Sequence, residues 1–301
     1  MVHKLKIGTR IGLGSTLLLL VALLVITPTV LHKIDEIVTE AERDALSRHY
    51  QTLTSQLESQ GKVAETLAML VSQIPEAQEA MAAGDRKQLE RMFVSGFKIL
   101  KRDYAADQFQ FHTAPAWSMF RVHMPAKFGD DLSSFRHTVV QTNTEKRPVA
   151  GLEHGVAGLG IRGVVPMFKG EKHLGSVEFG MSFGQPFFDT FKKAYGVDVA
   201  LRLKKSDGGF STFGSTFGDS LFSAEQLADA FEGQAAMGRT ALKGQPVAIY
   251  ANAVVDYSGK PIGVVEIAMD RSYYATAMSE ARNLTLLIGA LALVLGAGFA
   301  W

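Results

Sequence analysis

Two short stretches that repeat each other decide the fold: Leu174–Met181 reads LGSVEFGM, and Ile262–Met269 reads IGVVEIAM. Four of the eight aligned positions are identical. Each stretch follows a turn that contains glycine and lysine, and the preceding strands match in character, VVPMF from Val164 and AVVDY from Ala253. Because each stretch closes a block of predicted strands, we predict a duplicated five-stranded unit.

The first block begins after Tyr104, where the apolar period changes to two residues. A short helix is expected over Gly129–Gln141, because Asp130 and Asp131 suit a helix N-terminus. Predicted strands contain Phe109 and Phe111, and then cover Ser118–His123, Val149–Glu153, Gly160–Phe168 and His173–Phe183. The block therefore has five strands with a helical insertion between the second and the third.

The second block mixes helices and strands. Ser223 and Gln226 form a capping-box pattern, which predicts a helix over Ser223–Glu232. A further helix is expected over Gln185–Tyr195, and Tyr273–Leu284 returns to helix. Predicted strands cover Val197–Leu203, Gly209–Gly214, Ala241–Leu242, Val247–Val255 and Ile262–Met269.

Helices precede both blocks. Apolar residues recur at three- and four-residue spacing from His32 to Ile74, which predicts a long helix ended by Pro75. Shorter helices are expected over Pro75–Ala83 and Arg86–Lys101. A long helix with an apolar stripe needs a partner, so we predict a homodimer. The predicted fold class is α+β, with a long N-terminal helix followed by two tandem five-stranded antiparallel sheets.

Two uncharged apolar segments flank this region: Ile11–Leu31, of 21 residues, and Asn283–Trp301, of 19 residues. A helix of about 20 apolar residues crosses a membrane core of roughly 30 Å. The first segment exceeds the usual apolar run of a signal peptide, so we expect an uncleaved span. Lys4, Lys6 and Arg10 place its N-terminal flank in the cytoplasm. Since the chain stops inside the second segment, we expect a cytoplasmic part to follow.

The predicted organisation has seven parts. These are a cytoplasmic N-terminus (1–10), a first transmembrane helix (11–31), a periplasmic stalk and helical segment (32–104), a membrane-distal sheet domain (105–184), a membrane-proximal sheet domain (185–272), a connecting helix (273–282) and a second transmembrane helix (283–301).

Composition excludes several classes of protein. The 301 residues include 47% apolar residues and carry a formal net charge of +1, which argues against nucleic-acid binding and against wholesale disorder. Three of the 31 basic residues precede the first span, so residues 32–282 hold 28 basic and 30 acidic residues. Cysteine is absent, which excludes disulfides and thiolate metal sites.

The first block carries a sharper signal in five runs: FRVHMP from Phe120, FGDDLSSFR from Phe128, GLEHG from Gly151, GLGIRGVVP from Gly158 and GSVE from Gly175. With the basic flank and the two spans, they make the chain resemble the periplasmic sensor half of bacterial transmembrane receptors with a double Cache domain. This domain subtype occurs in methyl-accepting chemotaxis proteins, and the run LKIGTRIGLG from Leu5 resembles the start of many chemotaxis receptors. Sensor kinases and cyclic-di-GMP enzymes sometimes carry the same domain.

That resemblance implies two PAS-like sheets, a small-molecule ligand and an output through cytoplasmic signalling proteins. It also implies a location in the bacterial inner membrane, with residues 32–282 in the periplasm. The residue pattern typical of amino-acid-binding double Cache domains is not evident, so the resemblance does not specify an amino-acid ligand. Ligand binding is expected to shift the packing of the stalk helices and to move the second span by about 1–2 Å.

Unusual polar residues concentrate on the strands of the first block. Arg121 and His123 alternate with apolar neighbours and should share one face, and a guanidinium matches a carboxylate bidentately. We therefore predict a small anionic, carboxylate-like ligand, with aromatic side chains as apolar walls. The predicted ligand-binding residues are Arg121, His123, Arg136, Glu153, Arg162, Phe111, Trp117 and Phe120.

Several alternatives remain open at this point. Arg121 or Arg162 can instead pair internally with Glu153, Asp130 or Glu178. Glu178 has a counterpart in the second block, Glu266, which favours a structural role. The histidines His112 and His123 are only a weak metal signal, and we predict no metal or cofactor.

The sequence contains no catalytic motif such as GxSxG, GxxxxGK[ST] or HExxH. We therefore predict a sensor and not an enzyme. The alternatives to a chemotaxis receptor are the sensor region of a histidine kinase or diguanylate cyclase, and a receptor for a periplasmic binding protein that itself carries the ligand.

Overall fold

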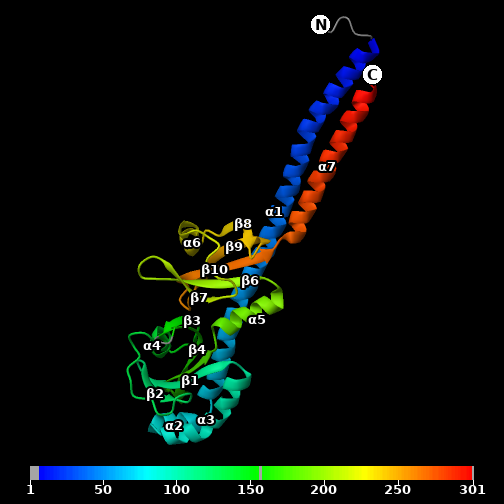
Figure 1. The fold of residues 1–301 in the computed structure, drawn as a ribbon. Coiled ribbons are helices and arrows are strands. Elements are labelled where there is room, and N and C mark those ends of the chain that lie inside the picture. The colour runs from blue at the N-terminus through cyan, green and yellow to red at the C-terminus, as the bar shows by residue number, and fades with distance from the viewer. Residues whose placement is uncertain (1–6, 156–157, 300–301) are drawn as a thin grey trace. The chain divides into compact units, whose positions relative to one another are not determined.

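The computed structural model describes residues 7–155 and 158–299 and confirms the predicted fold class (Figure 1). Backbone contacts divide the chain into two compact units, which are described separately. One unit consists of Met1–Arg48, Met237–Tyr250 and Ala268–Trp301, and the other of His49–Ala236 and Ala251–Ile267. The second of these units contains the whole of the first sheet.

The first sheet is antiparallel throughout, with strand order β2-β1-β5-β4-β3. The helix α4 (His137–Glu145) is inserted between the second and third strands, as predicted. The strands are β1 (Ala106–Thr113), β2 (Trp117–Arg121), β3 (Val149–Gly155), β4 (Gly158–Lys169) and β5 (Lys172–Met181).

The second sheet repeats this topology, with strand order β7-β6-β10-β9-β8. In the sequence, α5 (Gln185–Tyr195) precedes the first strand of this sheet, and α6 (Ala224–Phe231) lies between its second and third strands. Its strands are β6 (Asp198–Lys204), β7 (Phe210–Ser215), β8 (Ala236–Leu242), β9 (Gln245–Val255) and β10 (Pro261–Asp270). The two sheets thus have the same order position by position, which confirms two five-stranded units.

A close contact between strands explains why glycine recurs at the same place in LGSVEFGM and IGVVEIAM. A methyl group added at Gly175 on β5 would lie 1.9 Å from the backbone oxygen of His112 on β1. One added at Gly263 on β10 would lie 2.3 Å from the backbone oxygen of Arg202 on β6. Both strand pairs need a residue without a side chain there, and the contact makes His112 and Arg202 equivalent positions of the two sheets.

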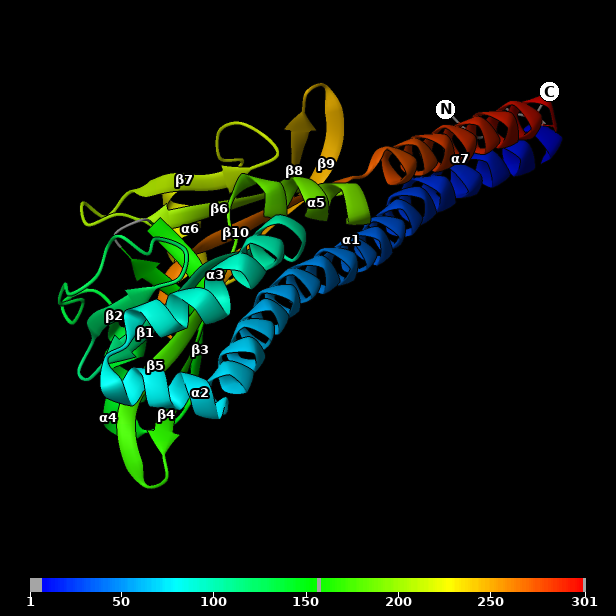
Figure 2. The ribbon, with the colours of Figure 1, turned by 90° about the horizontal axis from the view of Figure 1, so that it is seen from below.

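One face of the first sheet packs against three helices: the part of α1 (Ile7–Ser72) beyond His49, α2 (Pro75–Ala83) and α3 (Arg86–Asp103). Figure 2 shows α2 and α3 beside this sheet. Gly163 on β4 leaves room for α1, because a methyl group there would lie 2.1 Å from the backbone nitrogen of Glu65. The rings of Phe109 and Phe179 stack at 4.1 Å on this same face, which is the apolar core of the unit.

The opposite face of the first sheet is covered by α4 and by the segment that joins β2 to α4. Leu132, Val139 and Val164 are buried together there. The predicted bounds of α4, Gly129–Gln141, are wrong, because the helix begins only at His137 and ends at Glu145. Asp131 instead accepts hydrogen bonds from the backbone nitrogen and the hydroxyl of Ser133, which holds the chain in a turn.

Other element boundaries also differ from prediction. β2 ends at Arg121, and the residues up to Pro125 form a turn in place of the predicted strand end. β8 has seven residues where only two were predicted, because its partly exposed side chains show little apolar pattern. The predicted stalk and first span form one helix, α1, which ends at Ser72, and Pro75 begins α2.

In the other unit, α1 and α7 (Ser272–Phe299) run side by side (Figure 1). Both helices are long and apolar enough to cross a membrane. Beyond the apolar segments, the buried carboxylate of Glu42 on α1 accepts hydrogen bonds from the Nε atoms of Arg239 and Arg271, each at 2.8 Å. These charged groups join α1 to β8 and to the start of α7.

Candidate functional site

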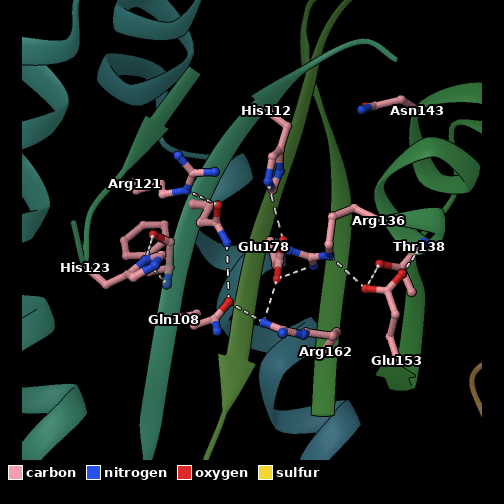
Figure 3. Close-up of polar contacts among 12 residues, drawn as sticks. Gln108, His112, Arg121, His123, Arg136, Thr138, Asn143, Glu153, Arg162 and Glu178 are labelled. Atoms are coloured by element: carbon pink, nitrogen blue, oxygen red, sulfur yellow. Dashed lines mark hydrogen bonds and ion pairs between the residues drawn. The ribbon is translucent and has the colours of Figure 1, made fainter. Parts of the chain in front are cut away.

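Polar side chains gather on the face of the first sheet that lies under α4, among them Arg121, His112 and Glu178 (Figure 3), and the strand register arranges them in two rows. In the first row, Gln110 on β1 lies opposite Arg121 on β2 and opposite Glu178 on β5. In the second row, His112 lies opposite Ser118 and opposite Ser176. Side chains directly opposite one another in a sheet point to the same face, so these six groups share one buried surface.

Arg136 joins α4 to this face. It is the N-cap residue of α4, and its Nε donates to Glu153 Oε2 at 2.9 Å while its Nη2 donates to Glu178 Oε1 at 2.6 Å. The backbone nitrogen of Thr138 donates to the other Glu153 oxygen at 2.7 Å. A carboxylate from β3 therefore caps α4 in place of a side chain from the helix itself.

Glu178 is buried completely and receives a second arginine. Arg162 Nη1 lies 3.2 Å from Glu178 Oε1 and also bonds to the side chain of Gln108. Burial alone would raise the pKa of Glu178, but the charges of Arg136 and Arg162 lower it to about 2. Glu178 is therefore ionised, and two arginines share one of its two oxygens.

His112 faces the other oxygen of Glu178. Its Nε2 lies 3.4 Å from Glu178 Oε2, but neither atom has a hydrogen bond within the described part of the chain. Burial lowers the pKa of His112 to about 4, although the charge of Glu178 opposes that change. The imidazole is therefore neutral at neutral pH.

Arg121 has a different kind of partner. Its two terminal nitrogens each lie 2.7 Å from an oxygen of Asp130, and its Nε donates to Gln110 at 3.2 Å. The Arg121 side chain is buried, whereas the Asp130 side chain is 40% exposed on the segment that covers this face. The hydrogen bonds from Arg121 lower the pKa of Asp130.

The remaining predicted residues lie apart from this cluster. His123 follows the end of β2, and its Nδ1 is 3.0 Å from the backbone oxygen of Phe109. Phe111 and Phe120 are paired on the opposite face, where Phe111 lies 5.6 Å from the ring of Phe93 on α3. Trp117 is 44% exposed at the start of β2. Strand alternation thus separates the predicted aromatic walls from the charged residues.

Nine buried side-chain atoms have no hydrogen-bond partner among residues 7–155 and 158–299, and all nine belong to residues between His112 and Glu178. Most lie on the polar face just described or on α4. They are both ring nitrogens of His112, the hydroxyls of Ser118, Thr142 and Ser176, Asn143 Oδ1, Arg162 Nε, His173 Nε2 and Glu178 Oε2. We refer to these nine as the unpaired atoms.

Sequence reasoning identified the charged members of the cluster but missed its neutral ones. Gln108, Gln110, Ser118 and Ser176 carry no signal in composition or spacing. The strand register was the signal that could have found them, because the register places Ser118 and Ser176 beside His112. Within the described residues, no group of three or more His, Asp or Glu side chains is arranged to hold a metal ion.

Fold and buried polar face together define a duplicated sensory domain of the PAS-like kind. The family described as "Double sensory domain of two-component sensor kinase", dCache_3, matches residues 39–274. The chain belongs to this family. No curated protein sequence matches it significantly.

Several solved structures are similar in fold. The sensory domain of the Campylobacter jejuni chemoreceptor Tlp3 with isoleucine bound has 10% identity and a TM-score of 0.50, covering 85% of this chain and 98% of that one. The extracellular domain of the putative histidine kinase vpHK1S-Z8 has 11% identity and a TM-score of 0.49, covering 82% and 98%. A domain of a sensory box/GGDEF family protein from Vibrio parahaemolyticus has 10% identity and a TM-score of 0.49, covering 78% and 97%. At such low identities the similarity concerns the fold alone.

Proposed function

We propose that the chain is the ligand-sensing part of a bacterial transmembrane chemotaxis receptor, and that the first sheet binds a small carboxylate-bearing molecule. The observation that carries this proposal is the position of the unpaired atoms, all nine of which belong to residues between His112 and Glu178, within the first sheet and α4. A buried polar atom without a partner costs about 1–3 kcal/mol. Such a group of atoms is satisfied by ordered water in the free protein and by ligand in the complex.

Arg121 is the residue that contacts the ligand carboxylate in this proposal. Every arginine of the cluster already has a carboxylate partner, so an incoming anion has to displace one. Glu153 and Glu178 are buried, whereas Asp130 is 40% exposed. Displacing Asp130 returns its charge to water, which is the smallest desolvation change available in the cluster.

The route of the signal to the membrane follows the chain. β10 ends at Asp270 and α7, the second candidate span, begins at Ser272, so a displacement of β10 acts directly on that helix. The protein is anchored in the inner membrane in this proposal, with residues 32–282 in the periplasm. Exposed apolar residues on α1, among them Val63 and Leu70, support a homodimer.

A second output is supported by the family description, which names two-component sensor kinases. The sensing function is the same in both cases, but the cytoplasmic partners differ. A receptor for a periplasmic binding protein is the third candidate. It is distinguished by Arg121, because direct binding of a small molecule requires that guanidinium.

The test is calorimetric titration and thermal denaturation of the whole chain in lipid nanodiscs, with a panel of carboxylates, amines and purines. We expect at least one carboxylate-bearing compound to bind and to raise the melting temperature. Arg121→Ala should abolish that binding, whereas Arg102→Ala, which alters an exposed arginine paired with Asp103, should not. A folded protein that binds no compound of the panel contradicts direct sensing.

A further inference from the structure

The charged group that joins α1 to α7 outside the apolar segments is centred on one carboxylate. Glu42 on α1 is completely buried, and each of its oxygens accepts a hydrogen bond. Arg271 Nε donates to Oε1 and Arg239 Nε donates to Oε2, both at 2.8 Å. The three residues belong to the same compact unit. The carboxylate therefore connects α1, β8 and the residue that precedes α7.

Arg239 is fixed to α1 at three points. Besides its bond to Glu42, its Nη1 donates to Asp35 at 2.7 Å and its Nη2 donates to the hydroxyl of Thr39 at 2.8 Å. These three acceptors follow one another at spacings of four and three residues, so they lie on one face of the helix. Because a guanidinium presents its donors as a rigid fork, the three bonds fix β8 against α1.

Arg271 is attached to α1 more weakly than Arg239. Within the described part of the chain, the bond from Nε to Glu42 is the one hydrogen bond of the Arg271 side chain, which is 15% exposed. Its backbone oxygen accepts a hydrogen bond from the nitrogen of Ala275 in the first turn of α7, at 2.9 Å. Arg271 also follows Asp270, the last residue of β10. A displacement of β10 or α7 therefore acts on this single bond.

The apolar parts of α1 and α7 hold the axial position of α7 less strictly. An apolar cavity of about 440 Å³ lies between them, and Leu23, Gly289 and Leu293 are among the residues that line it. Thr285 also lines this cavity, but its hydroxyl bonds to the backbone oxygen of Ala281 in its own helix. Apolar contacts are non-directional, so a small axial displacement changes their energy little. A hydrogen bond, in contrast, depends closely on distance and angle.

We propose that the ion pair of Glu42 with Arg271 is a latch that holds α7 at one axial position against α1, and that α7 moves along α1 only when this pair opens. Arg239 stays on Glu42 in the opened state, because its other bonds to α1 do not involve α7. The buried carboxylate thus keeps one charged partner, which makes the opened state accessible. The inference concerns the helix pair itself and does not depend on which molecule the first sheet binds.

A small displacement of α7 is enough to open the latch. Hydrogen bonds between nitrogen and oxygen have lengths of roughly 2.7–3.2 Å, and the bond from Arg271 to Glu42 lies near the lower end of this range. Helices that shift at packed interfaces move by about 1–2 Å, which exceeds the width of that range. Burial of the Arg271 side chain limits the rotamers that could follow such a movement. The pair therefore gives α7 two discrete positions, one latched and one displaced.

The absence of cysteine from the chain permits a direct measurement of the position of α7. A methyl group added at Gly289 would lie 3.6 Å from a Cδ atom of Leu23, so these two positions face each other. Leu293 lies four residues, about one turn, further along α7. The rate of disulfide formation under a mild oxidant is compared for the pair Leu23→Cys with Gly289→Cys and the pair Leu23→Cys with Leu293→Cys. The ratio of the two rates reports the axial position of α7.

The measurement uses the whole chain in lipid nanodiscs, and gel electrophoresis separates disulfides within one chain from those between chains. Arg271→Gln should increase the population of the displaced position about 10-fold, as for the loss of a hydrogen bond to a charged group, and should change the ratio accordingly. Lys33→Gln is the control, because the exposed pair of Lys33 with Glu36 lies within α1. Arg239→Gln should also leave the ratio nearly unchanged, since Arg271 keeps its bond to Glu42.

The outcomes decide the inference without any ligand. An unchanged ratio in Arg271→Gln, in a protein whose circular dichroism shows that it is folded, overturns the latch. An equal change in Lys33→Gln or in Arg239→Gln overturns the assignment to Arg271. If Arg271→Gln does not fold, Glu42→Gln replaces it: the charge that holds Arg271 is then removed, and an unchanged ratio in that variant overturns the latch as well. Each of these results leaves the proposed sensing function to its own titration.

Discussion

The two sheets of this chain have the same strand order and the same buried glutamate, but they satisfy that glutamate differently. In the second sheet, Arg202 and a backbone nitrogen occupy both oxygens of Glu266. In the first sheet, two arginines share one oxygen of Glu178 and the other faces a neutral histidine. The same scaffold therefore carries one buried glutamate whose two oxygens are both hydrogen-bonded by the chain, and another with one oxygen that has no donor among the described residues.

A second difference concerns the helices that follow the second strand of each sheet. α6 carries its own capping box, in which Ser223 and Gln226 bond reciprocally. Within the described structure, the N-cap residue of α4 makes no side-chain cap bond, and the carboxylate of Glu153 on β3 instead accepts a hydrogen bond from the backbone nitrogen of Thr138 in the first turn. A displacement of Arg136 or Glu153 would therefore act directly on the first turn of α4, whereas the first turn of α6 is capped by residues of that helix and its own N-cap.

The largest loss of unfolding free energy is expected at the repeated glycine, where the two sheets are most alike. Gly175→Ala should cost more than about 3 kcal/mol of unfolding free energy, because the new methyl group would overlap a backbone oxygen and because φ is +139°. Gly263→Ala should cost a comparable amount. The measurement is the denaturant midpoint of the chain in micelles.

Gly170→Ala is the control for this pair. It also has a positive φ, +59°, but no atom lies within 4 Å of the added methyl group, so a loss of about 1 kcal/mol is expected. Equal losses in Gly175→Ala and Gly170→Ala would show that the close strand contact does not determine the repeat.

The next effect distinguishes the two sheets. Arg136→Met should cost about 3–5 kcal/mol, because it leaves two buried carboxylates, those of Glu153 and Glu178, with fewer donors. Arg202→Met removes the arginine partner of one buried carboxylate, that of Glu266, so its loss of unfolding free energy should be at the lower end of this range. Chemical denaturation of both variants measures the difference, and a larger loss for Arg202→Met would contradict the ranking.

The sequence alone predicted the strands and the repeat, but it did not predict how the two buried glutamates differ in their surroundings. Alternation, turn residues and the repeat located nine of the ten strands closely, because side-chain period and turn chemistry are local properties. The pairing of Arg162 with Glu178 was among the internal alternatives weighed, and the structure contains it. The role of His112 was missed, since its equivalence to Arg202 depends on the contact of Gly175 with a neighbouring strand.

The errors have one physical cause, which is that tertiary contacts override local preference. Asp130 and Asp131 favour a helix N-terminus in isolation, but Arg121 engages one and Ser133 the other. Likewise, Phe111 and Phe120 resemble the walls of a pocket until the register places them against α3. Which face of a strand meets which layer is decided by residues distant in sequence.

Acid should destabilise the protein through His112. The pKa of His112 is lowered to about 4 in the folded chain from 6.5, so between these values the unfolded chain binds the proton and the folded chain does not. Stability therefore falls as the pH drops from 6.5 to 4, with a slope of at most about 1.4 kcal/mol per pH unit. His112→Gln should remove this part of the slope, and His154→Gln, at an exposed position, should not.

Below pH 4.5, protonation of Glu178 also lowers the stability of the folded protein. Its pKa is lowered to about 2, so the stability that its ionised form provides is lost as the pH falls from 4.5 toward 2. Thermal denaturation over a pH series measures both ranges. An unchanged slope in His112→Gln between pH 6.5 and 4 would contradict a neutral buried imidazole.

The smallest effect is expected at the helix caps, and it tests whether only the first sheet couples its helix to a ligand. Ser223→Ala should cost about 1 kcal/mol, because it removes the cap of α6, and should leave ligand affinity unchanged. Thr138→Val removes the hydroxyl contact of Thr138 with Glu153 and should cost a similar amount while also changing ligand affinity. Denaturation and calorimetry on the two variants separate these readouts. Reduced ligand affinity in Ser223→Ala would mean that the second sheet shares in binding, since the capping hydrogen bonds of Ser223 are with Gln226 of the same helix and not with the polar face of the first sheet.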